Sequence, residues 1–138
     1  DNFRKGIRNY YKKYYNSTTT TNQFKTEMEV VSGMNLDTFF DQWLYKGGNM
    51  VLDGNWKFDE KKGRIEVNLN QVQNDGYLFE MPVELGISYN DKNLEKIQTV
   101  KLEKEKGRFY IASDSKPISI KIDPNTKLLA IWDFNEIK

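Results

Sequence analysis

The sequence predicts a segregated α+β fold, in which a short helical segment precedes a seven-stranded antiparallel β-sandwich. Up to about residue 46, apolar residues recur every third or fourth position, which is the spacing of one helix face. From Met50 onward apolar and polar residues alternate, and turn-forming residues recur about every ten positions, as they do between strands. This change of period predicts two parts, a helical part over residues 1–46 and a sandwich over residues 49–138.

The first predicted helix covers residues 1–15 and carries an aromatic face and a basic face. Its apolar and aromatic positions are Phe3, Ile7, Tyr10, Tyr11 and Tyr14. Its basic positions are Arg4, Lys5, Arg8, Lys12 and Lys13. The basic face indicates either an electrostatic docking helix or a solvated helix surface, and the solvated surface is the commoner case. The segment's tyrosines (Tyr10, Tyr11, Tyr14 and Tyr15) could stack on bases or sugars, but such residues more often pack half-buried.

Two further helices follow a polar loop over residues 16–21. Thr20 and Gln23 have the spacing of a capping box, and Gly33 is placed to end the helix that they begin. One stripe of that helix contains Phe24, Met28 and Val31. Asn35 can cap the next helix, whose expected single apolar face contains Leu36, Phe39, Phe40, Trp43 and Leu44. About 45 residues rarely fold alone, so these faces are expected to need a partner, either the β part or a larger helical domain.

Seven strands with one apolar face each are predicted downstream. They centre on residues 56–58, 65–69, 79–89, 97–102, 108–112, 118–122 and 128–134. Turns are expected at residues 60–63, 74–76, 90–93 and 123–126. Pro82 cannot donate to a sheet, which predicts an edge position or a bulge. The strand count and the long strand with its proline favour an immunoglobulin-like sandwich over a closed barrel.

Composition excludes several kinds of chemistry. The chain has 21 basic and 20 acidic residues, a net charge of +1, which argues against a general nucleic-acid or anionic-membrane binder. Histidine and cysteine are both absent. This excludes an ordinary zinc site, an imidazole base and a disulfide within these residues. No apolar run approaches the ~20 residues of a membrane span.

The remaining polar candidates carry little chemistry. Two acidic pairs lie on predicted helices, Glu27 with Glu29 and Asp37 with Asp41, and Asp37 is explained by the preference for acids in a first helical turn. Asp53-Gly54-Asn55 and Asp123-Pro124-Asn125 could touch calcium, but each lacks a full ligand loop and is expected to be a turn. The sequence therefore assigns no catalytic, cofactor-binding or metal-binding residue.

The helical part resembles the closing segment of the catalytic domain in the aminopeptidase N family of zinc metallopeptidases. The matching residues are Gly6, Ile7, Tyr10, Tyr11, Lys13 and Tyr14; Thr20, Thr21 and Phe24; Val31, Ser32 and Gly33; and Leu36, Phe39, Phe40, Gln42, Trp43 and Leu44. In that family this segment is followed by a small β-sandwich, which the run from Ile122 to Asn125 and the pair Leu128–Leu129 also resemble. One departure is that 46–50, between the two parts, contains no proline.

The resemblance implies a parent enzyme that removes N-terminal residues from peptides, with zinc held by an H-E-x-x-H helix and a downstream Glu. Since this chain has no histidine, the motif is expected upstream of Asp1, and the chain is expected to be an inactive piece of a longer protein. The implied partner is the upstream catalytic domain, and self-association through exposed aromatic helix faces is a further expectation. The alternative is an independent immunoglobulin-like module that binds protein or carbohydrate.

Overall fold

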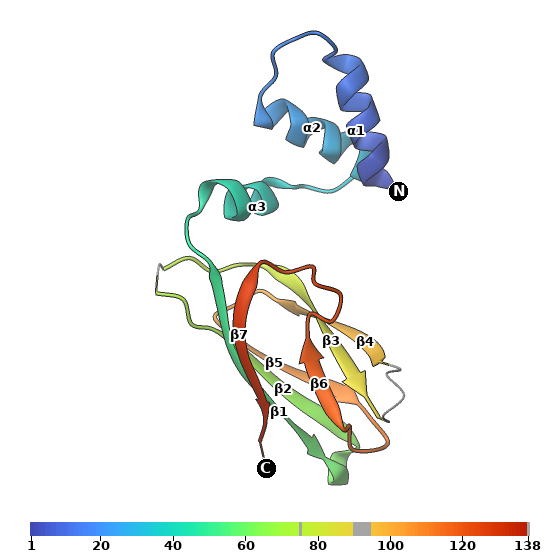
Figure 1. Ribbon diagram of the computed structural model, residues 1–138, viewed down its shortest axis with the longest axis vertical. Helices are drawn as coiled ribbons and strands as arrows, with labels where there is room; N and C mark the ends of the chain where they lie inside the picture. The colour runs from blue at the N-terminus through green and yellow to red at the C-terminus, as the bar shows by residue number, and fades with distance from the viewer. Residues whose placement is uncertain (75, 90–94, 138) are drawn as a thin grey trace. The chain divides into compact units, whose positions relative to one another are not determined.

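The computed structural model describes residues 1–74, 76–89 and 95–137 (Figure 1). The chain divides into two compact units, Asp1–Lys46, here called the helical unit, and Gly47–Lys138, here called the β unit. None of the helices in the described ranges is long and apolar enough to cross a membrane.

The helical unit contains α1 (Asn2–Lys13), α2 (Thr21–Ser32), α3 (Asp37–Phe40) and a π-helix (Asp41–Tyr45). The predicted capping box is confirmed, because the Thr20 hydroxyl accepts from the Gln23 N–H and the Gln23 side chain accepts from the Thr20 N–H. Gly33 ends α2 in the left-handed conformation, with φ of 70°, as predicted. The α1 and α2 helices approach closely at Gly6, whose missing side chain leaves room for Met28.

The helix predicted after Asn35 changes type after Phe40. Residues 41–45 form a π-helix, in which the Lys46 N–H donates to the Asp41 carbonyl at 2.9 Å. The wider π turn shifts the side chains away from the 3.6-residue period that the prediction assumed. Phe40 is buried, while Phe39 and Leu44 are more than half exposed.

Seven strands lie in the described residues of the β unit. They are β1 (Met50–Asp59), β2 (Arg64–Gln71), β3 (Met81–Ser88), β4 (Glu95–Leu102), β5 (Lys106–Ala112), β6 (Ser119–Ile122) and β7 (Ala130–Glu136). They form two sheets, ordered β5-β2-β1-β7 and β4-β3-β6, in a sandwich-like arrangement (Figure 1). The core lies between the sheets, where the inward positions of β1, β2 and β3 are almost fully buried.

The sandwich is not strictly antiparallel, which corrects the predicted fold class. β7 runs parallel to β1, with Met50 opposite Ala130 and Trp56 opposite Glu136. Alternation reveals that a segment is a strand but not the direction of its neighbour, so the sequence could not show this pairing. The pairs β1–β2, β2–β5 and β3–β6 match the immunoglobulin order. In that order the fourth strand pairs with the fifth and the seventh with the sixth, whereas here β4 pairs with β3 and β7 pairs with β1.

Pro82 occupies a local edge of a central strand. β3 lies between β4 and β6, but β6 pairs only with residues Leu85 to Ser88. Pro82 pairs with Lys101 of β4 and has no partner from β6. The proline is therefore tolerated because one side of β3 is uncovered at this point.

The predicted turn at 60–63 is a short 3-10 helix (Glu60–Lys62) closed by Gly63, and the turn predicted at 90–93 lies outside the described residues.

Candidate interaction surface of the helical unit

The first acidic pair is engaged in structural contacts. Glu27 is buried and its carboxylate bonds to the Lys13 ammonium, which ties α2 to α1. This contact raises the pKa of Lys13. Glu29 Oε1 accepts from the Leu36 N–H at 2.9 Å, so Glu29 fixes the chain that leaves α2. Each carboxylate thus has its own partner, and the two do not act together on a ligand.

The second acidic pair also has separate partners. Asp37 bonds to Lys25 and accepts from the Asn35 amide at 3.0 Å. The contact with the Lys25 ammonium, and after it the one with Asn35, lowers the pKa of Asp37. The ion pair with Asp37 in turn raises the pKa of Lys25. Asp41 pairs with Lys46 at 3.2 Å. A general acid needs a raised pKa, and Asp37 is shifted in the opposite direction.

The calcium candidates are structural elements. Asp123 is buried, and its two carboxylate oxygens accept from the N–H groups of Lys127 and Leu128, both at 2.8 Å. The turn predicted there is confirmed. The turn predicted at Asp53–Asn55 is wrong, because these residues lie inside β1. Among residues 1–74, 76–89 and 95–137, no group of three or more His, Cys, Asp or Glu side chains could hold a metal.

The four tyrosines of the first segment divide into two pairs. Tyr10 packs against Phe24 with ring centroids 5.1 Å apart, and against Tyr14 at 5.3 Å. Packing was the predicted role, and it holds for these two. Tyr11 and Tyr15 contact each other at 5.5 Å, but they remain 66% and 62% exposed.

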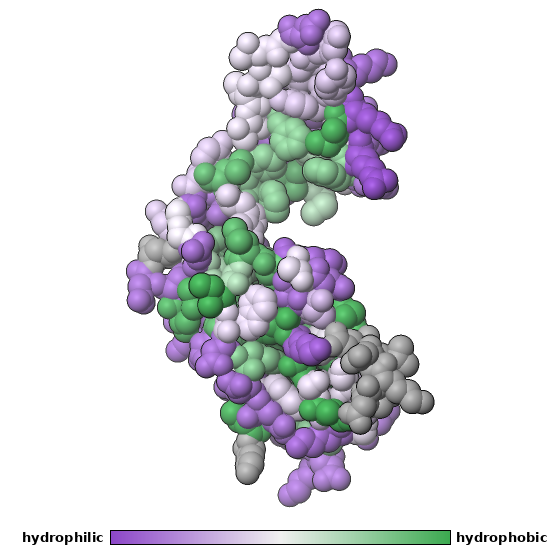
Figure 2. All heavy atoms as spheres, viewed as in Figure 1, coloured by the Kyte–Doolittle hydropathy of each residue, from purple (hydrophilic) through white to green (hydrophobic). Residues whose placement is uncertain are grey.

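Tyr11 and Tyr15 belong to a row of exposed apolar residues on α1 and the residues after it. The row, here called the α1 stripe, consists of Phe3, Ile7, Tyr11 and Tyr15. Phe3 also lines an apolar groove of about 250 Å³ between the helices. The other residues lining this groove are Asn2, Phe24, Met28, Ser32, Leu36, Phe39 and Phe40. Figure 2 shows apolar side chains in green beside a row of hydrophilic side chains in purple on this unit. The helical unit therefore presents an exposed row on α1 that meets an apolar groove at Phe3.

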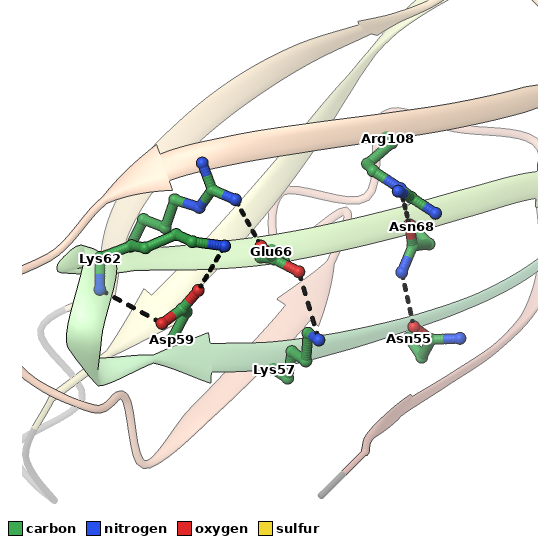
Figure 3. Close-up of polar contacts among 8 residues, drawn as sticks. Asn55, Lys57, Asp59, Lys62, Glu66, Asn68 and Arg108 are labelled. Atoms are coloured by element: carbon green, nitrogen blue, oxygen red, sulfur yellow. Dashed lines mark hydrogen bonds and ion pairs between the residues drawn. The ribbon is translucent and has the colours of Figure 1, made fainter.

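The β unit presents a polar network that sequence reasoning missed (Figure 3). On the outer face of the β1–β2–β5 sheet, Glu66 pairs with Arg64 at 2.6 Å and with Lys57 at 3.3 Å. The hydrogen bond from Arg64, and after it the one from Lys57, lowers the pKa of Glu66, although burial acts to raise it. Asn68 donates to Asn55 at 2.9 Å and accepts from Arg108 at 3.1 Å. The alternation of polar residues predicted this outer face, but the cross-strand register that pairs them was not predictable.

Comparison with known proteins agrees with the predicted resemblance at the level of fold. The chain superposes on part of the crystal structure of Legionella pneumophila aminopeptidase A, in complex with aspartic acid, with a TM-score of 0.78. The match covers 96% of this chain and 15% of that chain at 14% identity. At this identity the likeness is one of fold.

A second match comes from sequence. Transcription initiation factor TFIID subunit 2 of Saccharomyces cerevisiae is 32% identical over 60 residues, which cover 44% of this chain and 4% of that protein. No family model matches the chain. The chain therefore spans only a small part of both proteins.

Proposed function

We propose that this chain is a non-catalytic C-terminal portion of a zinc-dependent aminopeptidase, an enzyme that removes N-terminal residues from peptides. In this proposal residues 1–46 are the last helices of the catalytic domain and residues 49–138 are the sandwich that follows it. The observation that carries the proposal is the aminopeptidase fold match, which spans 96% of the chain and so includes both parts. The motif residues in the helical part, such as Phe39, Phe40 and Trp43, support it independently.

The residues of this chain do not fit a zinc site. Histidine and cysteine are absent, and Glu27, Asp37 and Asp123 each bond to other groups of the chain. The zinc and its catalytic Glu belong, in this proposal, to an upstream domain. The role left to this chain is to pack against that domain and to support the cleft where the peptide binds.

Two experiments test the proposal. Sequencing the gene upstream of the codon for Asp1 should reveal an H-E-x-x-H motif and a downstream Glu, and an upstream region without them would refute it. A peptidase assay on the 138-residue chain should give no turnover above background with or without added zinc. Turnover that a chelator abolishes would contradict the non-catalytic role. Saturable binding of a glycan or protein through the β-unit loops would favour the independent binding module.

A further inference from the structure

The α1 stripe has the geometry of a docking face for another helix. Three of its members, Phe3, Ile7 and Tyr11, are spaced four residues apart on α1 and form a slanted row of about two turns. Tyr15 follows the end of the helix and extends the row through its contact with Tyr11. Phe3, Tyr11 and Tyr15 are each more than 60% exposed, and Ile7 is 39% exposed. The neighbouring row, which contains Gly6 and Tyr10, already packs on α2. The stripe therefore lies beside an occupied face and has no cover of its own among the described residues.

A row of cations borders the stripe on the side away from α2. Arg4, Arg8 and Lys12 repeat the four-residue spacing one position further along the helix, and Lys5 lies next to them. Arg4 pairs with Asp1 at 3.2 Å. Within the residues that the structure describes, Lys5, Arg8 and Lys12 make no ion pair. By contrast, many cations elsewhere have an acidic partner, namely Lys25, Lys46, Lys57, Lys62, Arg64, Lys101, Lys116 and Lys127. Within the helical unit, the described cations without an ion pair all lie along this edge of the stripe, because Arg4, Lys13, Lys25 and Lys46 are each paired.

We infer that the α1 stripe docks an amphipathic helix with carboxylates along one edge of its apolar face, and that this helix belongs to the catalytic domain proposed above. Its location in that domain rests on the proposed function, whereas its chemistry rests on the stripe and its charged edge. Apolar contact would supply the binding energy, and opposite charges would fix the direction and register of the two helices.

The charge pattern disfavours two other occupants. A helix that lies on an anionic membrane buries its apolar face in the lipid and has a polar face rich in Lys and Arg. Here α2 packs beside the stripe and brings a single cation, Lys25, which is paired with Asp37. A second copy of α1 would bring one carboxylate, Asp1, together with five further cations from residues 1–13. Neither occupant matches the cationic edge as well as an acidic helix does.

The inference can be tested by titrating the ¹⁵N-labelled chain with two designed helical peptides of about five turns. Both have the same leucine face, but one carries glutamates along one edge and the other carries lysines there. The glutamate peptide should shift the α1 amide resonances saturably at concentrations below about 1 mM. Its affinity should fall as salt rises, because exposed charges are screened. The lysine peptide should bind at least about tenfold more weakly.

Two double variants sharpen the test. Arg8→Glu with Lys12→Glu should weaken the glutamate peptide about tenfold and should strengthen the lysine peptide. The matched control, Lys61→Glu with Lys104→Glu, makes the same change in net charge in the β unit and should leave both affinities unchanged. Tyr11→Ala should weaken both peptides, because it removes apolar contact area. If a variant fails to fold, the comparison of the two peptides on the unaltered chain still tests the inference.

Several results would overturn the inference. These are equal binding of both peptides, absence of any shift at about 1 mM, self-association that depends on Tyr11 without peptide binding, and binding only to vesicles of phosphatidylcholine and phosphatidylglycerol. A different result would refute the proposed function. An upstream gene region without a zinc motif would refute that function and leave the peptide result standing. Failed peptide binding with the motif present would refute only the docking partner.

Discussion

The two units differ in how much apolar surface they bury for themselves. Among the described residues, the helical unit has two buried apolar side chains, Met28 and Phe40, and the β unit has sixteen. The sixteen are Met50, Leu52, Trp56, Ile65, Val67, Leu69, Phe79, Met81, Val83, Leu85, Ile87, Val100, Leu102, Ile111, Ile120 and Ile122. Burial of apolar area is the main favourable term in folding, so the β unit has its own core.

The exposed residues complete the comparison. Nine large apolar side chains are exposed in the 46 residues of the helical unit, and ten are exposed among the described residues of the larger β unit. Those of the helical unit are Phe3, Ile7, Tyr11, Tyr15, Val30, Met34, Phe39, Leu44 and Tyr45. The comparison teaches that the sandwich completes its own core, while the helical unit leaves most of its large apolar side chains exposed.

The largest expected effect is the loss of a core side chain from the β unit. Leu85, in the centre of β3, is fully buried. Leu85→Ala should lower the free energy of unfolding of the β unit by about 2–5 kcal/mol, measured by denaturant unfolding. Ile131→Ala, at a residue 64% exposed, is the control and should change it by less than about 0.5 kcal/mol. Similar costs for the two variants would show that β3 is not in the core.

The next effect compares a glycine in each unit. A Cβ on Gly54 would lie 2.7 Å from the backbone oxygen of Asn68, so Gly54→Ala should cost about 1–3 kcal/mol in denaturant unfolding. A Cβ on Gly6 would meet the Met28 sulfur at 2.4 Å, but this thioether can move. Alanine also favours a helix by about 1 kcal/mol over glycine.

Gly6→Ala should therefore be neutral within about 1 kcal/mol. Gly47→Ala is a steric control, because nothing lies within 4 Å of its Cβ position. A larger cost at Gly6 than at Gly54 would contradict the expectation that the Met28 side chain moves aside more easily than the backbone of Asn68.

A smaller effect is confined to the helical unit. Thr20→Ala removes the hydroxyl that accepts from the Gln23 N–H and should destabilise α2 by about 1 kcal/mol. The helical signal in circular dichroism should melt at a lower temperature, while the signal of the β unit stays unchanged. Thr18→Ala, in the loop before the cap, is the matched control. A shift of both transitions together would show that the two units unfold as one.

The smallest effect is the pH dependence of the outer sheet face. The folded pKa of Glu66 lies below its ordinary value of 4.5 because of Arg64 and Lys57. The ionised Glu66 carboxylate stabilises the β unit fully at pH values above the pKa that Glu66 has in the unfolded chain. This stabilisation is lost as the pH falls through the lower pKa that Glu66 has in the folded chain. Glu66→Gln should therefore make the acid-induced loss of β-unit stability shallower. Asp53→Asn is the control on the same face, and an equal change in both variants would contradict the role of Glu66.

Local signals were read from the sequence more reliably than pairings. The capping box at Thr20, the left-handed Gly33 and the turn at Asp123 follow from side chains that bond to nearby backbone, so a short window contains the information. The edge position of Pro82 is a local signal too, because a proline lacks the N–H that a sheet needs. The parallel β7 and the contact of Asn68 with Arg108 depend on residues far apart in sequence. The π turn at residues 41–45 was missed because the helical period was assumed to continue.

The candidate surface was predicted in outline. Helical spacing indicated aromatic faces that need a partner, and the cationic row was visible on the same segment. Which tyrosines pack and which stay exposed depended on where α2 lies against α1, and the sequence alone does not fix that. Tyr10 lies on the packed side, and Tyr11, one position later, lies about 100° around the helix.

Amide hydrogen exchange on the isolated chain tests the central claim most directly, because it reports the stability of each unit residue by residue. The account predicts that amides of β1, β2 and β3 are protected far more strongly than those of α1 and α2, which lack a complete core. Addition of the glutamate-edged peptide should raise protection in α1 and α2 alone. Protection in α1 and α2 equal to that in β2, without any added partner, would contradict the claim that the helical unit is incomplete.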